Sequence, residues 1–284
     1  MRLTRLFFCL MLASPNLGLA AEPKPSIQRF VELFKGLRSD TCEDRLMADE
    51  FSKTPSPLGV VTDRVHLSVD SLIAAYKRGL FPWEISSHGA VWYHPEQRGI
   101  LEFSDVEKNL SSNDQRFLRK ALSGNSPFTI TYDQAFKEVV VQCALMKRYY
   151  ANSESGERTL AGTWISDPFV ENYIALHQAG LAHSVEVWND GKLVAGTYGV
   201  FVDGVFAGES MFHLVDDHGR SLPESNNAGK LAMWALITRL KENGHTFIDT
   251  QMVAGLARKW GAKLIARDEF MSRLRVAQKR NLKF

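Results

Sequence analysis

The chain has 284 residues, of which 45% are hydrophobic and 23% charged, as in soluble globular proteins. The formal net charge is only +2, which excludes a strong overall attraction to nucleic acid, so any site for a polyanion must be a local basic patch. The three cysteines form no disulfide framework and no CxxC motif, and no HExxH motif occurs. We therefore predict no metal site.

The first 25 residues have the pattern of an export signal followed by a linker. Within residues 1–20, Arg2 and Arg5 precede the apolar run Leu6–Ala13, and small residues follow where a signal peptidase would need them. The run is too short to span a bilayer as a helix. Export is therefore one alternative. The others are an apolar N-terminal helix and a misassigned start codon.

From residue 26 to residue 149, helical and strand-like patterns alternate. Apolar residues at helical spacing predict helices, and alternation between apolar and polar residues predicts strands. The segment Ser39–Ser56 is polar and is followed by Pro57, so we predict a loop there. The other signals predict helices at 27–37, 68–79, 108–122 and 134–149, and strands at 99–103 and 128–132.

Two aromatic segments that contain proline lie close together, at Leu80–Trp83 and Val91–Pro95. Such segments form either an aromatic core, in which proline ends each strand, or a wall that lines a ligand site. The residues themselves leave both interpretations open.

The stretch His183–His213 contains three strand-like runs joined by Asp190-Gly191 and Asp203-Gly204. Asp-Gly between alternating apolar residues favours type I′ hairpin turns, which need positive φ at both central positions. We therefore predict a three-stranded antiparallel meander. The neighbouring elements that we predict are helices at 167–179, 228–243, 256–260 and 270–275, and a strand at 245–251.

Acidic residues lie in the two strands that flank the long helix 228–243. Glu209 ends an apolar strand, where a carboxylate is costly unless it is paired or used, and a hydrogen-bonded structural acid fits equally well. Asp249 and Gln251 share one face of their strand because side chains alternate. The long helix allows the two strands to lie parallel and adjacent, which would bring Glu209 close to Asp249. The order of elements predicts an α/β (α+β) fold with a mostly antiparallel sheet.

Several motifs, in order along the chain, resemble those of bacterial leucyl/phenylalanyl-tRNA–protein transferases. The likeness covers about Val65–Leu274. The matching segments are Ala74–Trp83 (AYxxGxFPW), Trp92–Leu101 (W(W/Y)xPxxRxxL), Gly162–Ile165 (GTWI), Tyr173–Phe212 (the run with HSVEVW, YGV and GESMF) and Phe247–Gln251 (IDCQ).

The resemblance implies a small N-terminal α/β domain, residues 26–125, and a C-terminal domain related to the GNAT acyltransferases, residues 126–284. It implies transfer of Leu or Phe, sometimes Met, from aminoacyl-tRNA to the N-terminal Arg or Lys of acceptor proteins, which creates a degradation signal. The implied partners are aminoacyl-tRNA and those proteins. No metal, cofactor or membrane is implied for the mature protein, and the implied location is the cytoplasm.

The resemblance also assigns roles to single residues. Asp249 and Gln251 match a catalytic proton relay, and Glu209 matches an acidic residue suited to an N-terminal Arg or Lys. One positioned base, an oxyanion contact and an apolar slot suffice for this reaction, because the aminoacyl ester is already activated. The residues that match the slot for the transferred side chain are Trp83, Trp164, Leu236 and Leu240.

Basic residues are candidates for contact with the tRNA, because phosphate contacts dominate such affinity. Each of them fits a solvated surface equally well. The candidate groups are Arg116 with Arg119 and Lys120, Lys147 with Arg148, and the basic tail at residues 275–284.

The chain departs from the family pattern near the implied site. Gly229 stands where the family has Ser, and Ala254 and Leu256 stand where it has hydrogen-bonding side chains. These changes and the leader keep a second hypothesis open, an exported, non-catalytic relative that binds peptide N-termini or another small ligand. A third is an acyltransferase of similar fold with a different donor.

Overall fold

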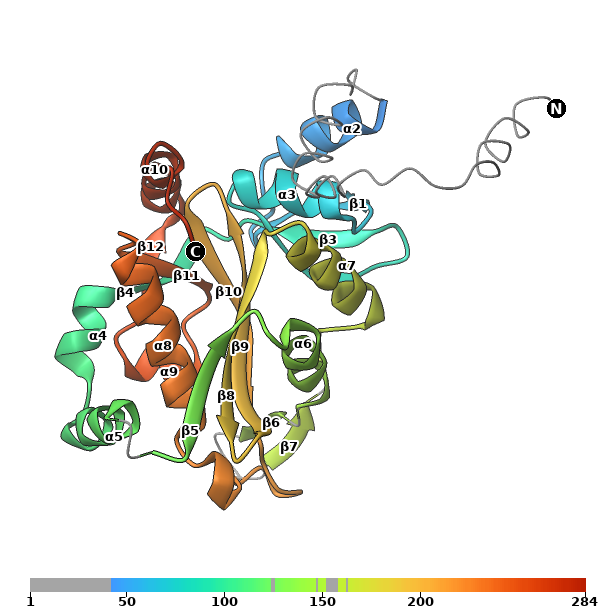
Figure 1. Cartoon of the computed structure of the whole chain (residues 1–284). Coiled ribbons are helices and arrows are strands. Elements are labelled where there is room, and N and C mark those ends of the chain that lie inside the picture. The colour runs from blue at the N-terminus through green and yellow to red at the C-terminus, as the bar shows by residue number, and fades with distance from the viewer. Residues whose placement is uncertain (1–41, 124–125, 147, 152–157, 162) are drawn as a thin grey trace, which may run out of the picture. The chain divides into compact units, whose positions relative to one another are not determined.

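The computed structural model describes residues 42–123, 126–146, 148–151, 158–161 and 163–284 (Figure 1). The leader at residues 1–25 and the helix predicted at 27–37 lie outside the described residues. Within the described part of the chain, no helix is both long and apolar enough to cross a membrane.

A small antiparallel sheet precedes the main one. It has the order β1-β3-β2 and consists of β1 (Val60–Val65), β2 (Phe81–Ile85) and β3 (Ala90–Tyr93). Helix α3 (Val69–Lys77) lies between β1 and β2 in the chain and begins at an N-cap, Ser68, as the sequence predicts.

The loop predicted at Ser39–Ser56 is wrong, because helix α2 (Cys42–Phe51) occupies most of it. Two apolar residues four positions apart, Met47 and Phe51, are buried in the core beside α3 and the small sheet. The Phe51 ring meets the ring of Trp92 edge to face at 5.0 Å. Packing of this one face stabilises the helix, although half of its residues are charged. The polar character of the whole segment Ser39–Ser56 therefore led to the wrong prediction.

A seven-stranded sheet forms the centre of the molecule, in the order β12-β4-β11-β10-β9-β8-β5. All neighbours are antiparallel except β10 and β11, which run parallel with Ala207 opposite Asp249. The mixed α/β fold, the mostly antiparallel sheet and the parallel pair are thus confirmed. The strands are β4 (Gln97–Glu102), β5 (Phe128–Tyr132), β8 (Ala182–Asn189), β9 (Lys192–Val202), β10 (Val205–His213), β11 (Phe247–Gln251) and β12 (Lys263–Ala266).

The meander predicted at residues 183–213 is the run β8-β9-β10. Both turns have positive φ at their two central residues, +48° and +77° at Asp190-Gly191 and +51° and +88° at Asp203-Gly204. The Asp-Gly signal therefore predicted both hairpins correctly.

Helices cover both faces of the large sheet (Figure 1). On one face, α6 (Phe136–Leu145) and α7 (Asp167–Gln178) pack in a core with β9 and α3. On the other face, α8 (Ala228–Glu242) packs on β8, β9 and β10. The remaining elements are α4 (Phe103–Asn109), α5 (Ser112–Leu122), β6 (Arg148–Ala151), β7 (Arg158–Ala161), η1 (Pro223–Ser225), α9 (Gly255–Lys259) and α10 (Arg267–Gln278).

The helix predicted at 108–122 is two helices. Helix α4 ends at Asn109, and the side chain of Ser111 then accepts a hydrogen bond from the Asp114 backbone, which caps α5. A serine cap satisfies backbone donors at a helix start, so it favours a new helix at this point.

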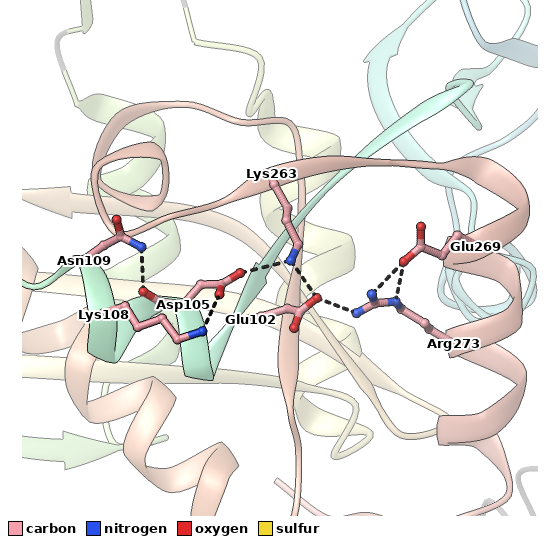
Figure 2. Close-up of polar contacts among 7 residues, drawn as sticks. All are labelled: Glu102, Asp105, Lys108, Asn109, Lys263, Glu269 and Arg273. Atoms are coloured by element: carbon pink, nitrogen blue, oxygen red, sulfur yellow. Dashed lines mark hydrogen bonds and ion pairs between the residues drawn. The ribbon is translucent and has the colours of Figure 1, made fainter.

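Strand β4 already belongs to the large sheet, so the change from one sheet to the other falls between Tyr93 and Gln97. The domain boundary at residue 125 stays a prediction. A chain of ion pairs joins the elements around β4 (Figure 2). Arg273 and Lys263 bind Glu102 at 2.9 Å and 3.0 Å, and Lys263 also binds Asp105 at 3.0 Å.

Candidate active site

The end of β11 has an unusual backbone at Gln251. Its φ is +59°, a left-handed backbone conformation that residues other than glycine rarely adopt. The backbone N–H of Gln251 donates to Oδ1 of Asp249 at 2.9 Å. The aspartate two residues earlier thus stabilises the turn that aims the Gln251 side chain.

Glu209 lies on the neighbouring strand β10, at an irregularity in its pairing with β9 between Gly208 and Ser210. Such bulges redirect a side chain out of the regular alternation. The carboxylate accepts three hydrogen bonds: from the Tyr76 hydroxyl (2.7 Å) and the Gln251 amide nitrogen (2.8 Å) at Oε1, and from the Tyr173 hydroxyl (3.1 Å) at Oε2.

Burial raises the pKa of Glu209 to about 7. Loss of water disfavours the charged carboxylate, and this effect outweighs the three hydrogen bonds, which lower the pKa. The negative charge of Asp249 adds a smaller rise. Glu209 is therefore a carboxyl group that titrates near neutrality inside a hydrogen-bonded cluster.

Arg98 on β4 holds the other acid of the site. Its Nε and Nη2 donate to Oδ1 and Oδ2 of Asp249 at 2.8 Å and 2.6 Å, and both side chains are buried. The guanidinium lies between two aromatic rings, 4.4 Å from the centre of Phe81 and 4.5 Å from the centre of Phe270. This ion pair is bidentate, the strongest geometry for such a pair.

A pocket of about 780 Å³ opens beside Gln251. Its walls are mostly apolar, and none of the described residues that line it carries a carboxylate. The lining residues are Leu58, Phe81, Trp83, Tyr93, Pro95, Gln97, Gln251, Met252, Val253, Arg258, Ala262, Lys263 and Leu264.

Trp164 contacts one of the rings that line this pocket. Its ring stacks on that of Trp83, with 5.7 Å between the centres and 15° between the planes. It also meets Phe169 of α7 edge to face at 5.3 Å. Trp164 therefore fixes the orientation of a pocket-lining ring without lining the pocket itself.

Two cations line the pocket, and they differ in their partners. Lys263 is bound to Glu102 and Asp105, so its charge is offset within the ion-pair chain of Figure 2. Arg258 is exposed and donates to the backbone carbonyl of Val253 at 2.8 Å. Of the two cationic residues among the described lining of the pocket, Arg258 is therefore the one whose charge is not offset by a carboxylate in an ion pair.

The structure brings five of the seven residues predicted for the site together: Glu209, Asp249 and Gln251 in one cluster, with Trp83 and Trp164 beside it. Leu236 and Leu240 lie elsewhere. They are buried in a core between α8 and the sheet, with residues such as Phe206 and Ile248, and they do not line the pocket.

Three residues of the site were not predicted as functional: Tyr76, Arg98 and Tyr173. Each lies inside a segment whose motif was recognised, so a signal existed. Their roles were hidden because hydrogen bonds to Glu209 and Asp249 cross 133, 36 and 151 positions of the chain, for Tyr76, Tyr173 and Arg98 respectively.

The residues that depart from the family pattern lie outside this cluster. A Cβ at Gly229 would approach the Met211 side chain at 3.4 Å and would meet His213 at 3.8 Å. Ala254 is exposed before α9, and Leu256 packs on the core beneath α8. Within the described residues, no three His, Cys, Asp or Glu side chains form a group that could hold a metal ion.

Comparisons with known proteins agree with the motifs. The family described as "Leucyl/phenylalanyl-tRNA protein transferase" matches residues 106–275, and its N-terminal domain matches residues 66–96. The chain is 38% identical to the leucyl/phenylalanyl-tRNA–protein transferase of Pseudoalteromonas atlantica, over 78% of this chain and 84% of that protein. It is also 38% identical to that of Sulfurimonas denitrificans, over 76% and 82%.

These matches place the chain among the aminoacyltransferases. It belongs to the leucyl/phenylalanyl-tRNA–protein transferase family, as its motifs predicted. Among solved structures, L-PGS from Bacillus licheniformis is similar with a TM-score of 0.33 and 10% identity, over 74% of this chain and 71% of that one. A likeness of this degree bears on neither fold nor function, so the relation to GNAT acyltransferases stays a prediction.

Proposed function

We propose that the protein transfers Leu, Phe or Met from aminoacyl-tRNA to the N-terminal Arg or Lys of acceptor proteins and thereby creates a degradation signal. One observation carries the proposal. The amide of Gln251 lies at the wall of an apolar pocket, and Glu209 holds its nitrogen. With Glu209 ionised, the amide oxygen is the atom that is left to meet an incoming amine.

The pocket suits the transferred side chain rather than the acceptor residue. Its aromatic and aliphatic walls favour Leu, Phe or Met through burial of apolar surface. A cationic Arg or Lys side chain would meet Arg258 and Lys263 there and no carboxylate among the described lining residues. We therefore place the aminoacyl group in the pocket, against Trp83.

The reaction needs an uncharged amine and a fixed geometry. The amine nitrogen attacks the ester carbonyl carbon, a C–N bond forms, and the C–O bond to the terminal ribose breaks. The proton that leaves the nitrogen is taken up by that ribose oxygen, so the products are the extended protein and uncharged tRNA. A free α-amino group has a pKa of about 7.7–8.0, so a useful fraction is already unprotonated at neutral pH.

Within this reaction we assign Gln251 as the catalytic residue, because its amide oxygen can accept an N–H of the amine and hold it beside the ester. Glu209 orients that amide. The three internal donors on the Glu209 carboxylate leave it poorly suited to bind a cationic side chain directly. Asp249 acts on the backbone of Gln251 rather than on the amine.

For the tRNA, we propose that Arg258 offers its positive charge at the pocket to a terminal phosphate. The exposed residues Arg119 and Lys120 in the last turn of α5 are further candidates. Lys147 lies outside the described residues.

We place the reaction in the cytoplasm, where aminoacyl-tRNA is made. N-terminal sequencing of the native protein tests this. An intact N-terminus supports it, whereas a mature start at Ala21 would favour the exported, non-catalytic relative.

The direct test is transfer of labelled Leu or Phe from charged tRNA to peptides that differ only in their first residue. We expect transfer to peptides that begin with Arg or Lys and none to peptides that begin with Glu. The Pseudoalteromonas atlantica relative serves as the positive control. Absence of transfer by this protein while the relative is active would refute the proposal.

A further inference from the structure

We propose that Arg98 is a positioning residue of this active site: it fixes Asp249 as a rigid ionic partner, and Asp249 in turn fixes the backbone of Gln251. The inference rests on the proposed function, because it assigns roles within the same transfer reaction. It also removes Asp249 from the role of general base.

The contacts of Asp249 leave little room for proton transfer. Each of its carboxylate oxygens accepts a hydrogen bond from Arg98, and Oδ1 accepts a second one from the Gln251 backbone. Both lone pairs of Oδ1 therefore face donors, and Oδ2 faces the guanidinium of Arg98. Asp249 is buried and does not line the pocket, whereas Gln251 does.

Arg98 is itself held from two sides. Phe81 comes from β2 of the small sheet and Phe270 from α10, and the guanidinium lies between their rings at 4.4 Å and 4.5 Å. The side chain is 2% exposed. Phe81 also lines the pocket, so the same ring forms part of the pocket wall and packs against the guanidinium that holds Asp249.

The consequence is a continuous chain of contacts from Arg98 through Asp249 and Gln251 to Glu209. The two carboxylates hold Gln251 at different points: Asp249 holds its backbone in the left-handed conformation, and Glu209 holds its amide nitrogen. Since a displacement of about 1 Å at a reacting group can lower a rate roughly 100-fold, loss of the Arg98 anchor should lower turnover without removing any group that touches substrate.

The first variant is Arg98→Lys, which keeps the charge but cannot form two parallel hydrogen bonds. We expect kcat to fall at least about 10-fold while KM for aminoacyl-tRNA changes less than about 3-fold. Arg273→Lys is the matched control. Like Arg98, Arg273 is ion-paired and lies near an aromatic ring, 5.9 Å from the ring centre of Phe247. Its partners are Glu102 and Glu269, so the kcat of the Arg273→Lys variant should be unchanged.

The second variant separates positioning from base catalysis. Asp249→Asn leaves Arg98 buried without a counter-charge and should be nearly inactive. In Arg98→Gln/Asp249→Asn both charges are gone and two amides can pair, so activity should recover at least about 10-fold over Asp249→Asn alone. A double variant as inactive as Asp249→Asn, which is the result expected of a lost base, would overturn the inference.

Hydrogen–deuterium exchange over residues 249–253 gives a readout that does not need activity. Arg98→Lys should speed exchange in this segment at least about 5-fold, because Asp249 accepts a hydrogen bond from the backbone N–H of Gln251. Arg273→Lys should leave the exchange rate unchanged. Unchanged exchange in Arg98→Lys would also overturn the inference. If the wild type transfers nothing, the proposed function fails, and the exchange comparison still decides the role of Arg98.

Discussion

The raised pKa of Glu209 makes a quantitative prediction for the variant Glu209→Gln. Glutamine has the same shape, can accept from Tyr76 and Gln251, and can donate to the Tyr173 hydroxyl. In the folded wild type the pKa of the Glu209 carboxyl is about 7, against an ordinary value of 4.5 for glutamate. Between these values the unfolded chain has lost its proton and the folded chain has kept it, so the contribution of Glu209 to stability falls as pH rises from about 4.5 to about 7 and is constant above.

The size of this effect follows from the shift. The difference between 7 and 4.5 is about 2.5 pKa units, which at about 1.36 kcal/mol per unit gives about 3 kcal/mol. The free energy of unfolding, measured in urea from about pH 5 to pH 8, should therefore rise for Glu209→Gln relative to the wild type by up to about 3 kcal/mol, with most of the change below pH 7.

Asp216→Asn provides the control for this experiment. Hydrogen bonds from the Arg220 backbone and side chain and from the His218 backbone lower the pKa of Asp216 to about 2, so this carboxylate stays ionised from pH 5 to pH 8. Its difference from the wild type should be the same across that range. A Glu209→Gln difference that is equally independent of pH would refute the account of a buried, reluctantly ionised Glu209.

Three further variants test the roles around Gln251. Gln251→Ala should lower kcat roughly 100-fold and leave the fold intact. The control is Gln278→Ala, which removes an exposed amide that donates to the Lys77 carbonyl and should leave kcat unchanged. Similar kcat values for the two variants would show that Gln251 is not the catalytic residue. Trp83→Ala should lower kcat/KM for Phe-tRNA roughly 10-fold, mainly through KM, and an unchanged KM would place the transferred side chain elsewhere. Tyr76→Phe removes a hydrogen bond that lowers the pKa of Glu209, so the pKa of Glu209 in the folded protein should rise. The pH at which the free energy of unfolding stops decreasing should therefore move upward, and a downward shift would contradict this reasoning.

Local patterns predicted the elements well where the deciding interactions lie close in sequence. The Asp-Gly turns of the meander and the Ser68 cap of α3 are both signals of a few residues, and both occur as predicted. Helix α2 was missed because its stability comes from Met47 and Phe51 packing on the core, which the charged residues between them do not reveal.

Part of the site was also predictable, because some of its features depend on residues that lie close together in the sequence. Alternation along β11 puts Asp249 and Gln251 on one face, and the long helix before it predicts the parallel pairing with β10. Strand alternation could not show that Gln251 takes a left-handed backbone or that Arg98 occupies both oxygens of Asp249. These features arise from contacts between distant segments, so the division of labour between the two acids became visible only in the folded chain.

In the proposed reaction, the side-chain amide of Gln251 presents an amine to an aminoacyl ester bound in the adjoining pocket. Single-turnover transfer of labelled Phe from charged tRNA to a peptide that begins with Arg, compared between wild type and Gln251→Ala, tests it most directly. We predict rapid transfer by the wild type and a rate roughly 100-fold lower in the variant, with unchanged binding of the tRNA. Equal rates, or no transfer by the wild type beside an active relative, would contradict the claim.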